Sequence, residues 1–100
     1  MANICQIGAG MIGQAMAIDL ARDHNVSLGD ININSIKDKI KNHPSIEVSK
    51  IDVLNQKETL TFIKKADIVL LAVPPGLELC EAYITLVPTD IAPVTALVIL

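Results

Sequence analysis

The stretch Ile7–Met16, with the sequence IGAGMIGQAM, decides the fold prediction because it places three glycines between an apolar run and a helical pattern. Gly8 allows a tight turn, Gly10 leaves room for a closely approaching ligand, and Gly13 lets the next helix lie close to the strand. The free N–H groups of that helix would then point at a bound phosphate. The spacing predicts a pyrophosphate cradle, although a plain glycine turn between strand and helix is the alternative that spacing alone leaves open.

Strand and helix patterns alternate along the chain. The expected strands span residues 3–7, 26–30, 46–53, 67–73 and 95–100, and the expected helices span residues 11–23, 34–42, 56–65 and 77–86. Strands joined by helices with short connections imply right-handed crossovers and a parallel sheet. We therefore expect an α/β fold with a Rossmann-like doubly wound parallel sheet in three α/β/α layers. Ligands of such sheets lie beyond the carboxyl ends of the strands.

Composition narrows the class of protein further. The chain has 100 residues, which predicts one domain, and its net charge of −3 comes from interspersed acids and bases. Neither nucleic acid nor a membrane is therefore expected as a partner. Cys5 and Cys80 lie in apolar contexts and are expected to be reduced packing residues of a cytoplasmic protein. No metal-ligand spacing is present, and His24 and His43 lack a neighbouring ligand or nucleophile, so neither is predicted to be catalytic.

The second expected strand ends in an acid at the distance that a dinucleotide site requires. Asp30 follows Gly8 by 22 residues, and its carboxylate is placed to accept hydrogen bonds from the adenosine ribose. It would repel a 2′-phosphate, and the residue that follows is Ile31 rather than a cation, so the sequence favours NAD over NADP. The alternative is that Asp30 caps the next helix or faces water.

Two later strand ends complete the candidate site. After the third strand, Asp52 and Val53 are expected near the adenine, with Val53 packing on the ring; an exposed acid that opens the next helix is the alternative. After the fourth strand, Ala72, Val73 and Pro74 would line the nicotinamide ribose, since proline stiffens the backbone, although a plain turn explains them nearly as well. The candidate cofactor-binding residues are therefore Gly8, Ala9, Gly10, Met11, Ile12, Gly13, Asp30, Ile31, Asp52, Val53, Ala72, Val73 and Pro74. No catalytic residue is identified.

With these motifs in place, the sequence resembles the N-terminal dinucleotide-binding domain of the saccharopine dehydrogenase and lysine dehydrogenase family. The resemblance covers about residues 1–86 and rests on IGAGMIGQAMAIDLA, on SLGDIN, and on the run from IDV to AVPPG. It implies an NAD(P)-dependent oxidoreductase of amino-acid metabolism that transfers a hydride at a carbon–nitrogen bond. A small amino-acid-like substrate would bind largely to a second domain, which this chain lacks, so the chain alone is expected to bind the dinucleotide and to be inactive.

Other interpretations remain open. One is a regulatory NAD(H)-sensing domain of the kind that gates potassium channels and transporters, in which the loop after the fourth strand is usually acidic or polar rather than PPG. Another is a related reductase acting on imines or sugar acids. The chain ends at Leu100 inside an apolar run, which predicts a truncated domain. An uncovered last strand would expose an unpaired edge, so we expect dimerisation or modest solubility.

Overall fold

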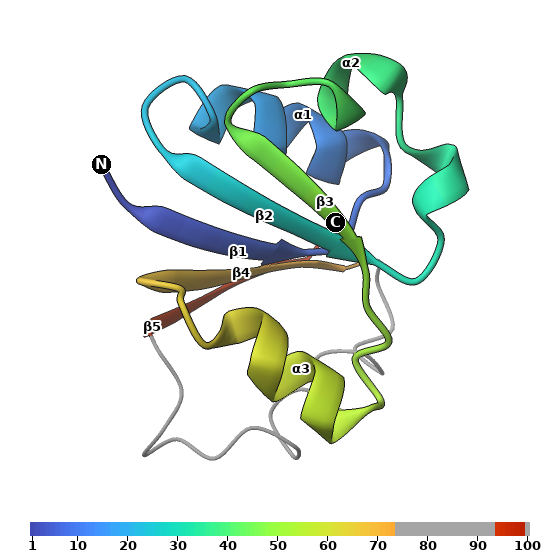
Figure 1. Cartoon of the computed structure of the whole chain (residues 1–100), viewed down its shortest axis with the longest axis vertical. Coiled ribbons are helices and arrows are strands. Elements are labelled where there is room, and N and C mark those ends of the chain that lie inside the picture. The colour runs from blue at the N-terminus through green and yellow to red at the C-terminus, as the bar shows by residue number, and fades with distance from the viewer. Residues whose placement is uncertain (74–93, 100) are drawn as a thin grey trace.

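The computed structural model describes residues 1–73 and 94–99, and within them five strands form one parallel sheet. The strand order is β3-β2-β1-β4-β5, with β1 (Asn3–Ile7) in the centre between β2 (Asn25–Asp30) and β4 (Ile68–Val73). β3 (Ile46–Lys50) and β5 (Val94–Ile99) form the edges. The helices α1 (Met11–Leu20) and α2 (Asp38–Lys41) cover one face, and α3 (Gln56–Ile63) covers the other (Figure 1). The predicted doubly wound, three-layer α/β fold is confirmed.

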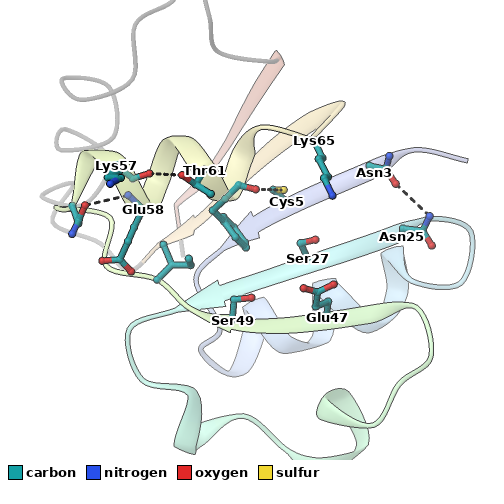
Figure 2. Close-up of a pocket in the computed structure, with 13 residues that line it drawn as sticks. Asn3, Cys5, Asn25, Ser27, Glu47, Ser49, Lys57, Glu58, Thr61 and Lys65 are labelled. Atoms are coloured by element: carbon teal, nitrogen blue, oxygen red, sulfur yellow. Dashed lines mark hydrogen bonds between the residues drawn. The ribbon is translucent and has the colours of Figure 1, made fainter.

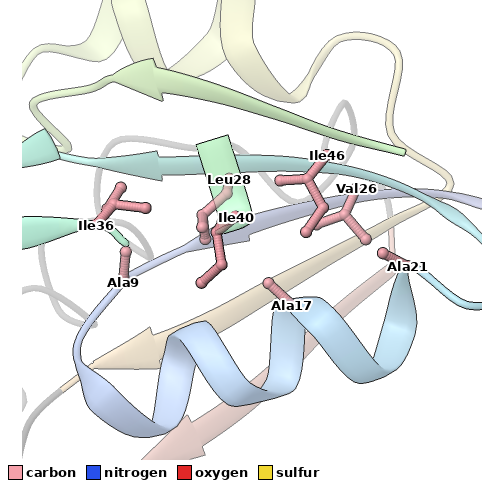
Figure 3. Packing of buried hydrophobic residues seen from close by; sticks show 8 residues of the cluster. All are labelled: Ala9, Ala17, Ala21, Val26, Leu28, Ile36, Ile40 and Ile46. Atoms are coloured by element: carbon pink, nitrogen blue, oxygen red, sulfur yellow. The ribbon is translucent and has the colours of Figure 1, made fainter. Parts of the chain in front are cut away.

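Small residues let α1 lie close against the sheet. Gly13 and Ala17 are buried one turn apart on α1, and Ala21 follows at the helix end. These residues have little or no side chain, so the helix backbone approaches Val26 and Leu28 of β2 (Figure 3). The remaining members of this apolar cluster are Ala9, Ile36, Ile40 and Ile46.

A second apolar cluster fills the space under α3. Cys5 and Ile7 of β1 pack with Val69 and Leu71 of β4 and with Ile63 of α3. The alternation of side chains along a strand sends Gln6, which lies between Cys5 and Ile7, to the opposite face. The two clusters therefore lie on opposite sides of one sheet.

The prediction of one helix over residues 34–42 is wrong. The chain forms a 3-10 turn at Ile33–Ser35 and the short helix α2, with Ile36 between them in an extended conformation and only 3% exposed. Burying the Ile36 side chain in the apolar cluster beside α1 interrupts the helix, and the Asn32 side chain caps the 3-10 turn by accepting a hydrogen bond from Asn34 N–H (3.2 Å).

The other element boundaries differ less. The third strand ends at Lys50 rather than at residue 53, because the Asp52 carboxylate accepts a hydrogen bond from Leu54 N–H (3.0 Å) and turns the chain. Asn55 then caps α3 by accepting from Glu58 N–H (3.1 Å). α1 ends three residues earlier than predicted and α3 two residues earlier, while the last strand lies at Val94–Ile99. The predicted helix over residues 77–86 lies outside the described residues.

Candidate functional site

Residues 8–10, between β1 and α1, form the glycine loop, which lies at the carboxyl edge of the sheet and touches the end of β4. Gly8 has a φ of 114°, a conformation that favours glycine, and its N–H extends the β1–β2 ladder to Gly29 O (2.8 Å). A Cβ built on Gly8 would lie 1.9 Å from the Ala72 carbonyl oxygen, which no rearrangement of a side chain can relieve. Only glycine therefore fits at the point where the loop meets β4.

The other two glycines of the motif have different roles. A Cβ on Gly13 would lie 2.6 Å from Gly8 O, so this glycine allows the helix to contact the loop. A Cβ on Gly10 would meet no atom of residues 1–73 and 94–99 within 4 Å, and Gly10 has ordinary extended angles (φ −71°, ψ −174°) as the N-cap of α1. The protein itself does not require glycine at position 10. The open space there fits a ligand group that approaches the backbone closely.

The start of α1 presents backbone donors to this open space. The first helical hydrogen bond runs from Gln14 N–H to Gly10 O (2.8 Å), so the N–H groups of residues 11–13 precede it and have no intrahelical partner. Such donors, together with the positive end of the helix dipole, bind phosphate groups. The residues present therefore fit the pyrophosphate of a dinucleotide.

Asp30 is fixed beside the loop by two backbone groups. Its Oδ2 accepts a hydrogen bond from Ala9 N–H (2.7 Å), and its Oδ1 accepts one from Asn32 N–H (2.8 Å). The carboxylate thus bridges the glycine loop and the connection after β2, rather than capping the helix that follows. Each oxygen retains a lone pair for a further donor.

Exposed apolar side chains surround this edge of the sheet. Within the described residues, five large hydrophobic side chains are exposed, and four of them follow the ends of β1, β2 and β3: Met11 (85%), Ile12 (54%), Ile31 (60%) and Leu54 (65%). Exposed apolar groups gathered at one edge are typical of a surface that binds a ligand or another domain.

The structure gives Val53 and Asp52 different roles from those expected. The Val53 side chain is 5% exposed and belongs to the cluster under α3, so it does not face a ligand, whereas the side chain of the next residue, Leu54, faces outward. Asp52 is half-buried and accepts from Leu54 N–H in the turn before α3, whose N-cap is Asn55, so it does not open the next helix as the alternative expected. Ala72 is buried (2%) against Gly8, Val73 ends β4, and Pro74 lies outside the described residues.

A separate groove of about 760 Å³ lies on the α3 face of the sheet. Figure 2 shows polar side chains of β1, β2 and β3 along its floor, among them Cys5, Ser27 and Glu47, with α3 as one wall. A Cβ on Gly29 would lie 3.0 Å from both the Phe62 ring and the Ile51 side chain, so these two groups pack tightly over β2 at this point. Burial raises the pKa of the Cys5 thiol, while its hydrogen bond with Ser27 opposes that shift.

The histidines have structural partners. His24 Nδ1 accepts a hydrogen bond from Ala2 N–H (2.9 Å), and His43 Nδ1 accepts one from Ser45 N–H (3.0 Å). Among residues 1–73 and 94–99, no group of three or more His, Cys, Asp or Glu side chains is arranged to hold a metal ion. The same residues contain no helix long and apolar enough to cross a membrane.

The strand order, the glycine loop and the acid at the end of β2 together define a Rossmann domain that binds a nicotinamide dinucleotide. Residues 4–82 match the profile of the family described as saccharopine dehydrogenase NADP binding domain. The chain belongs to this family, and the predicted resemblance is confirmed.

Three solved structures share the fold of this chain. A short-chain dehydrogenase/reductase from Veillonella parvula in complex with NADP has a TM-score of 0.79 at 16% identity, over 96% of this chain and 46% of that chain. Saccharopine dehydrogenase (L-Glu forming) from Saccharomyces cerevisiae has a TM-score of 0.71 at 18% identity, over 86% of this chain and 19% of that chain. A putative epimerase from Bacteroides thetaiotaomicron has a TM-score of 0.72 at 24% identity, over 98% of this chain and 46% of that chain.

These TM-scores establish a shared fold. This chain spans less than half the length of each of the three proteins. No match was found among curated protein sequences.

Two groups of residues at the site were missed by sequence reasoning. The first is Leu54, whose exposure follows from the burial of Val53 beside it. The second is the pair Gln6 and Gln14, both buried behind the glycine loop and hydrogen-bonded to its carbonyl groups. A glutamine within an apolar strand was the available signal for Gln6.

Proposed function

We propose that this domain holds the dinucleotide of an oxidoreductase of amino-acid metabolism that transfers a hydride at a carbon–nitrogen bond. The family assignment supports the class of enzyme, and the observation that carries cofactor binding is the open space beside Gly10 at the start of α1. When bound, the nicotinamide supplies the hydride chemistry, while the protein binds and orients it. The substrate-binding and acid–base residues are expected in a further domain, so this chain alone should be inactive.

The residues of the carboxyl edge would divide the dinucleotide among them. The N–H groups at the start of α1 bind the pyrophosphate, and the Asp30 carboxylate accepts hydrogen bonds from the ribose hydroxyls. Ile31 and Leu54 follow neighbouring strands with exposed apolar side chains, which suits the two sides of an adenine ring. We therefore replace Val53 by Leu54 as the expected adenine contact. A Leu54→Ser variant should bind NAD(H) more weakly, by about threefold to tenfold, with an unchanged melting temperature.

The preference between NAD and NADP is decided by one carboxylate in this proposal. The expected preference for NAD is not confirmed by the comparisons, because the family is described as NADP binding and the Veillonella structure contains NADP. The position of Asp30 supports a preference for NAD. Its carboxylate is fixed beside the loop by hydrogen bonds from Ala9 N–H and Asn32 N–H, where it would repel the 2′-phosphate of NADP. We retain the proposal of NAD on this argument.

Titration of the purified chain with NADH and with NADPH, followed by nucleotide fluorescence, tests both parts of the proposal. Tighter binding of NADH supports both parts. Binding of NADPH that equals or exceeds binding of NADH overturns the NAD assignment but leaves the dinucleotide domain intact. Failure to bind either nucleotide overturns cofactor binding itself.

Two further expectations rest on the sequence alone and stay predictions. A regulatory NAD(H)-sensing domain shares the glycine loop and the acid after β2; the sequence feature that distinguishes it, the loop after β4, lies outside the described residues. The expected cytoplasmic location is likewise untested.

A further inference from the structure

Gln6 is a fully buried polar residue on β1, directly beneath the glycine loop, with 0% of its side chain exposed. Its Nε2 donates to two backbone carbonyl oxygens, Gly8 O of the loop (3.0 Å) and Gly13 O of α1 (2.6 Å). Its Oε1 is buried and has no hydrogen-bond partner among the described residues. Rotating the amide by half a turn would place Oε1 against both carbonyl oxygens, so the hydrogen bonds fix the orientation and leave Oε1 unpaired.

Gln14 on α1 holds the same loop from its other side. Its Nε2 donates to Ala9 O (2.9 Å) and to Ser35 O (3.3 Å), and its Oε1 accepts from Lys37 N–H (3.1 Å). Its side chain is 7% exposed. Gln14 therefore ties the glycine loop to the connection that follows β2, where Asp30 lies.

The two glutamines fix successive peptide planes of the loop. In a trans peptide, the carbonyl of one residue and the N–H of the next point in opposite directions. Because Gln6 holds Gly8 O inward, Ala9 N–H points away from Gln6, where it donates to the Asp30 carboxylate (2.7 Å). Gln6 therefore orients the donor that anchors Asp30.

The next peptide follows the same rule. Because Gln14 holds Ala9 O, Gly10 N–H points away from Gln14, on the opposite side of that peptide plane. A Cβ on Gly10 would meet no atom of the described part of the chain within 4 Å, so this residue borders open space there. The carbonyl oxygens of Gly8 and Ala9 would repel a pyrophosphate. They are bound instead by the side-chain amides of Gln6 and Gln14 on the protein side.

We propose that Gln6 and Gln14 are positioning residues for the dinucleotide, which act by fixing the Gly8–Ala9 and Ala9–Gly10 peptide planes without contacting the ligand. This inference rests on the proposed cofactor binding. The Gln6 amide sets the Asp30 carboxylate that meets the ribose, and the Gln14 amide sets the Gly10 N–H that faces the phosphate. Gln6 retains an unpaired buried oxygen, which an apolar residue of similar shape would avoid.

The test compares Gln6→Met with wild type in NADH and NADPH titrations and in thermal unfolding. Methionine has a similar length and removes the unpaired oxygen, but it also removes the donor to Gly8 O and Gly13 O, so we expect a folded chain with a lowered melting temperature. The affinity for the preferred dinucleotide should fall by about tenfold or more. The ratio of the two dissociation constants should move toward one, because Asp30 loses its anchoring donor; a purely structural role would leave this ratio unchanged.

Two further variants keep the result interpretable. Gln14→Met should weaken binding of both nucleotides by a similar factor, and it tests the proposal if Gln6→Met fails to fold. Cys5→Ala is the matched control, because Cys5 neighbours Gln6 on β1 but packs under α3, and it should leave both affinities unchanged. The inference is overturned if wild type binds a dinucleotide and a folded glutamine variant binds both nucleotides with wild-type affinities. Absence of binding by wild type would instead overturn the proposed function.

Discussion

Replacing Gly10 by alanine should weaken ligand binding without a large change in protein stability. The open space for a ligand lies beside Gly10, whereas the tight backbone contact that requires glycine lies at Gly8. At Gly10 the added methyl meets no atom within 4 Å among the residues that the structure describes, and the backbone angles suit alanine. The weaker N-cap costs about 0.5–1 kcal/mol, and the reduced entropy of the unfolded chain returns about 0.4–1 kcal/mol. The free energy of unfolding should therefore change by less than about 1 kcal/mol.

The same substitution at Gly8 should be severe. A Cβ there lies 1.9 Å from the Ala72 carbonyl oxygen, and a φ of 114° is unfavourable for alanine. Backbone strain and overpacking together cost about 3 kcal/mol or more, a large part of the roughly 5–15 kcal/mol that stabilises a domain. Gly8→Ala is thus the matched positive control for damage to the fold.

Circular dichroism melting and nucleotide titration measure the two effects. For a domain of this size about 1 kcal/mol corresponds to roughly 4–8 °C, so Gly10→Ala should melt within about 8 °C of wild type and Gly8→Ala at least about 12 °C lower. A methyl group between backbone and pyrophosphate should weaken binding at least about tenfold, or about 1.4 kcal/mol. The reasoning is refuted if Gly10→Ala binds the dinucleotide as wild type does, or if it destabilises the protein as much as Gly8→Ala.

Three other substitutions probe the rest of the site and its support. Asp30→Asn removes the charge that would repel a 2′-phosphate, so NADPH affinity should rise relative to NADH affinity by about threefold to thirtyfold; an unchanged ratio in paired titrations contradicts the assigned role. Gly29→Ala places a Cβ 3.0 Å from the Phe62 ring, and this overpacking should lower stability by about 1–3 kcal/mol in urea unfolding without a change in affinity. Burial raises the pKa of the Cys5 thiol, so a Cys80→Ser variant should react with a disulfide reagent at pH 8 far more slowly when folded than in urea. Because the pKa of Cys5 is higher in the folded state than in the unfolded state, the stability that Cys5 contributes is complete below its ordinary pKa. This stability is lost as the pH rises through the raised pKa. Melting curves at alkaline pH should show the loss when compared with Cys5→Ala in the same background.

The sequence predicted most of the fold because each strand is a short apolar run and each connection carries a turn signal. It predicted the glycine loop and Asp30 for the same reason, since both lie at strand ends. The prediction of one helix over residues 34–42 was wrong because Ile36 enters a core formed by other segments and interrupts the helix. Local propensity contains no information about such a contact.

The expectation that Val53 rather than Leu54 faces the ligand also failed because it used a local pattern. The third strand ends at Lys50, and the turn at Asp52 changes which side chains face inward, so the alternation expected along a strand no longer applies. A glutamine within an apolar strand marked Gln6 as unusual, but its partners could not be predicted, because they are backbone carbonyl oxygens that every residue possesses. Only the three-dimensional arrangement shows which carbonyls it reaches.

The contact between Gly8 and Ala72 has a mechanical consequence. The two backbones meet so closely that not even a methyl group fits between them, and interiors packed in this way transmit strain rather than absorb it. A shift of the carboxyl end of β4 therefore pushes directly on the first residue of the loop. The end of β4 and the glycine loop are therefore coupled through a direct contact between their backbones.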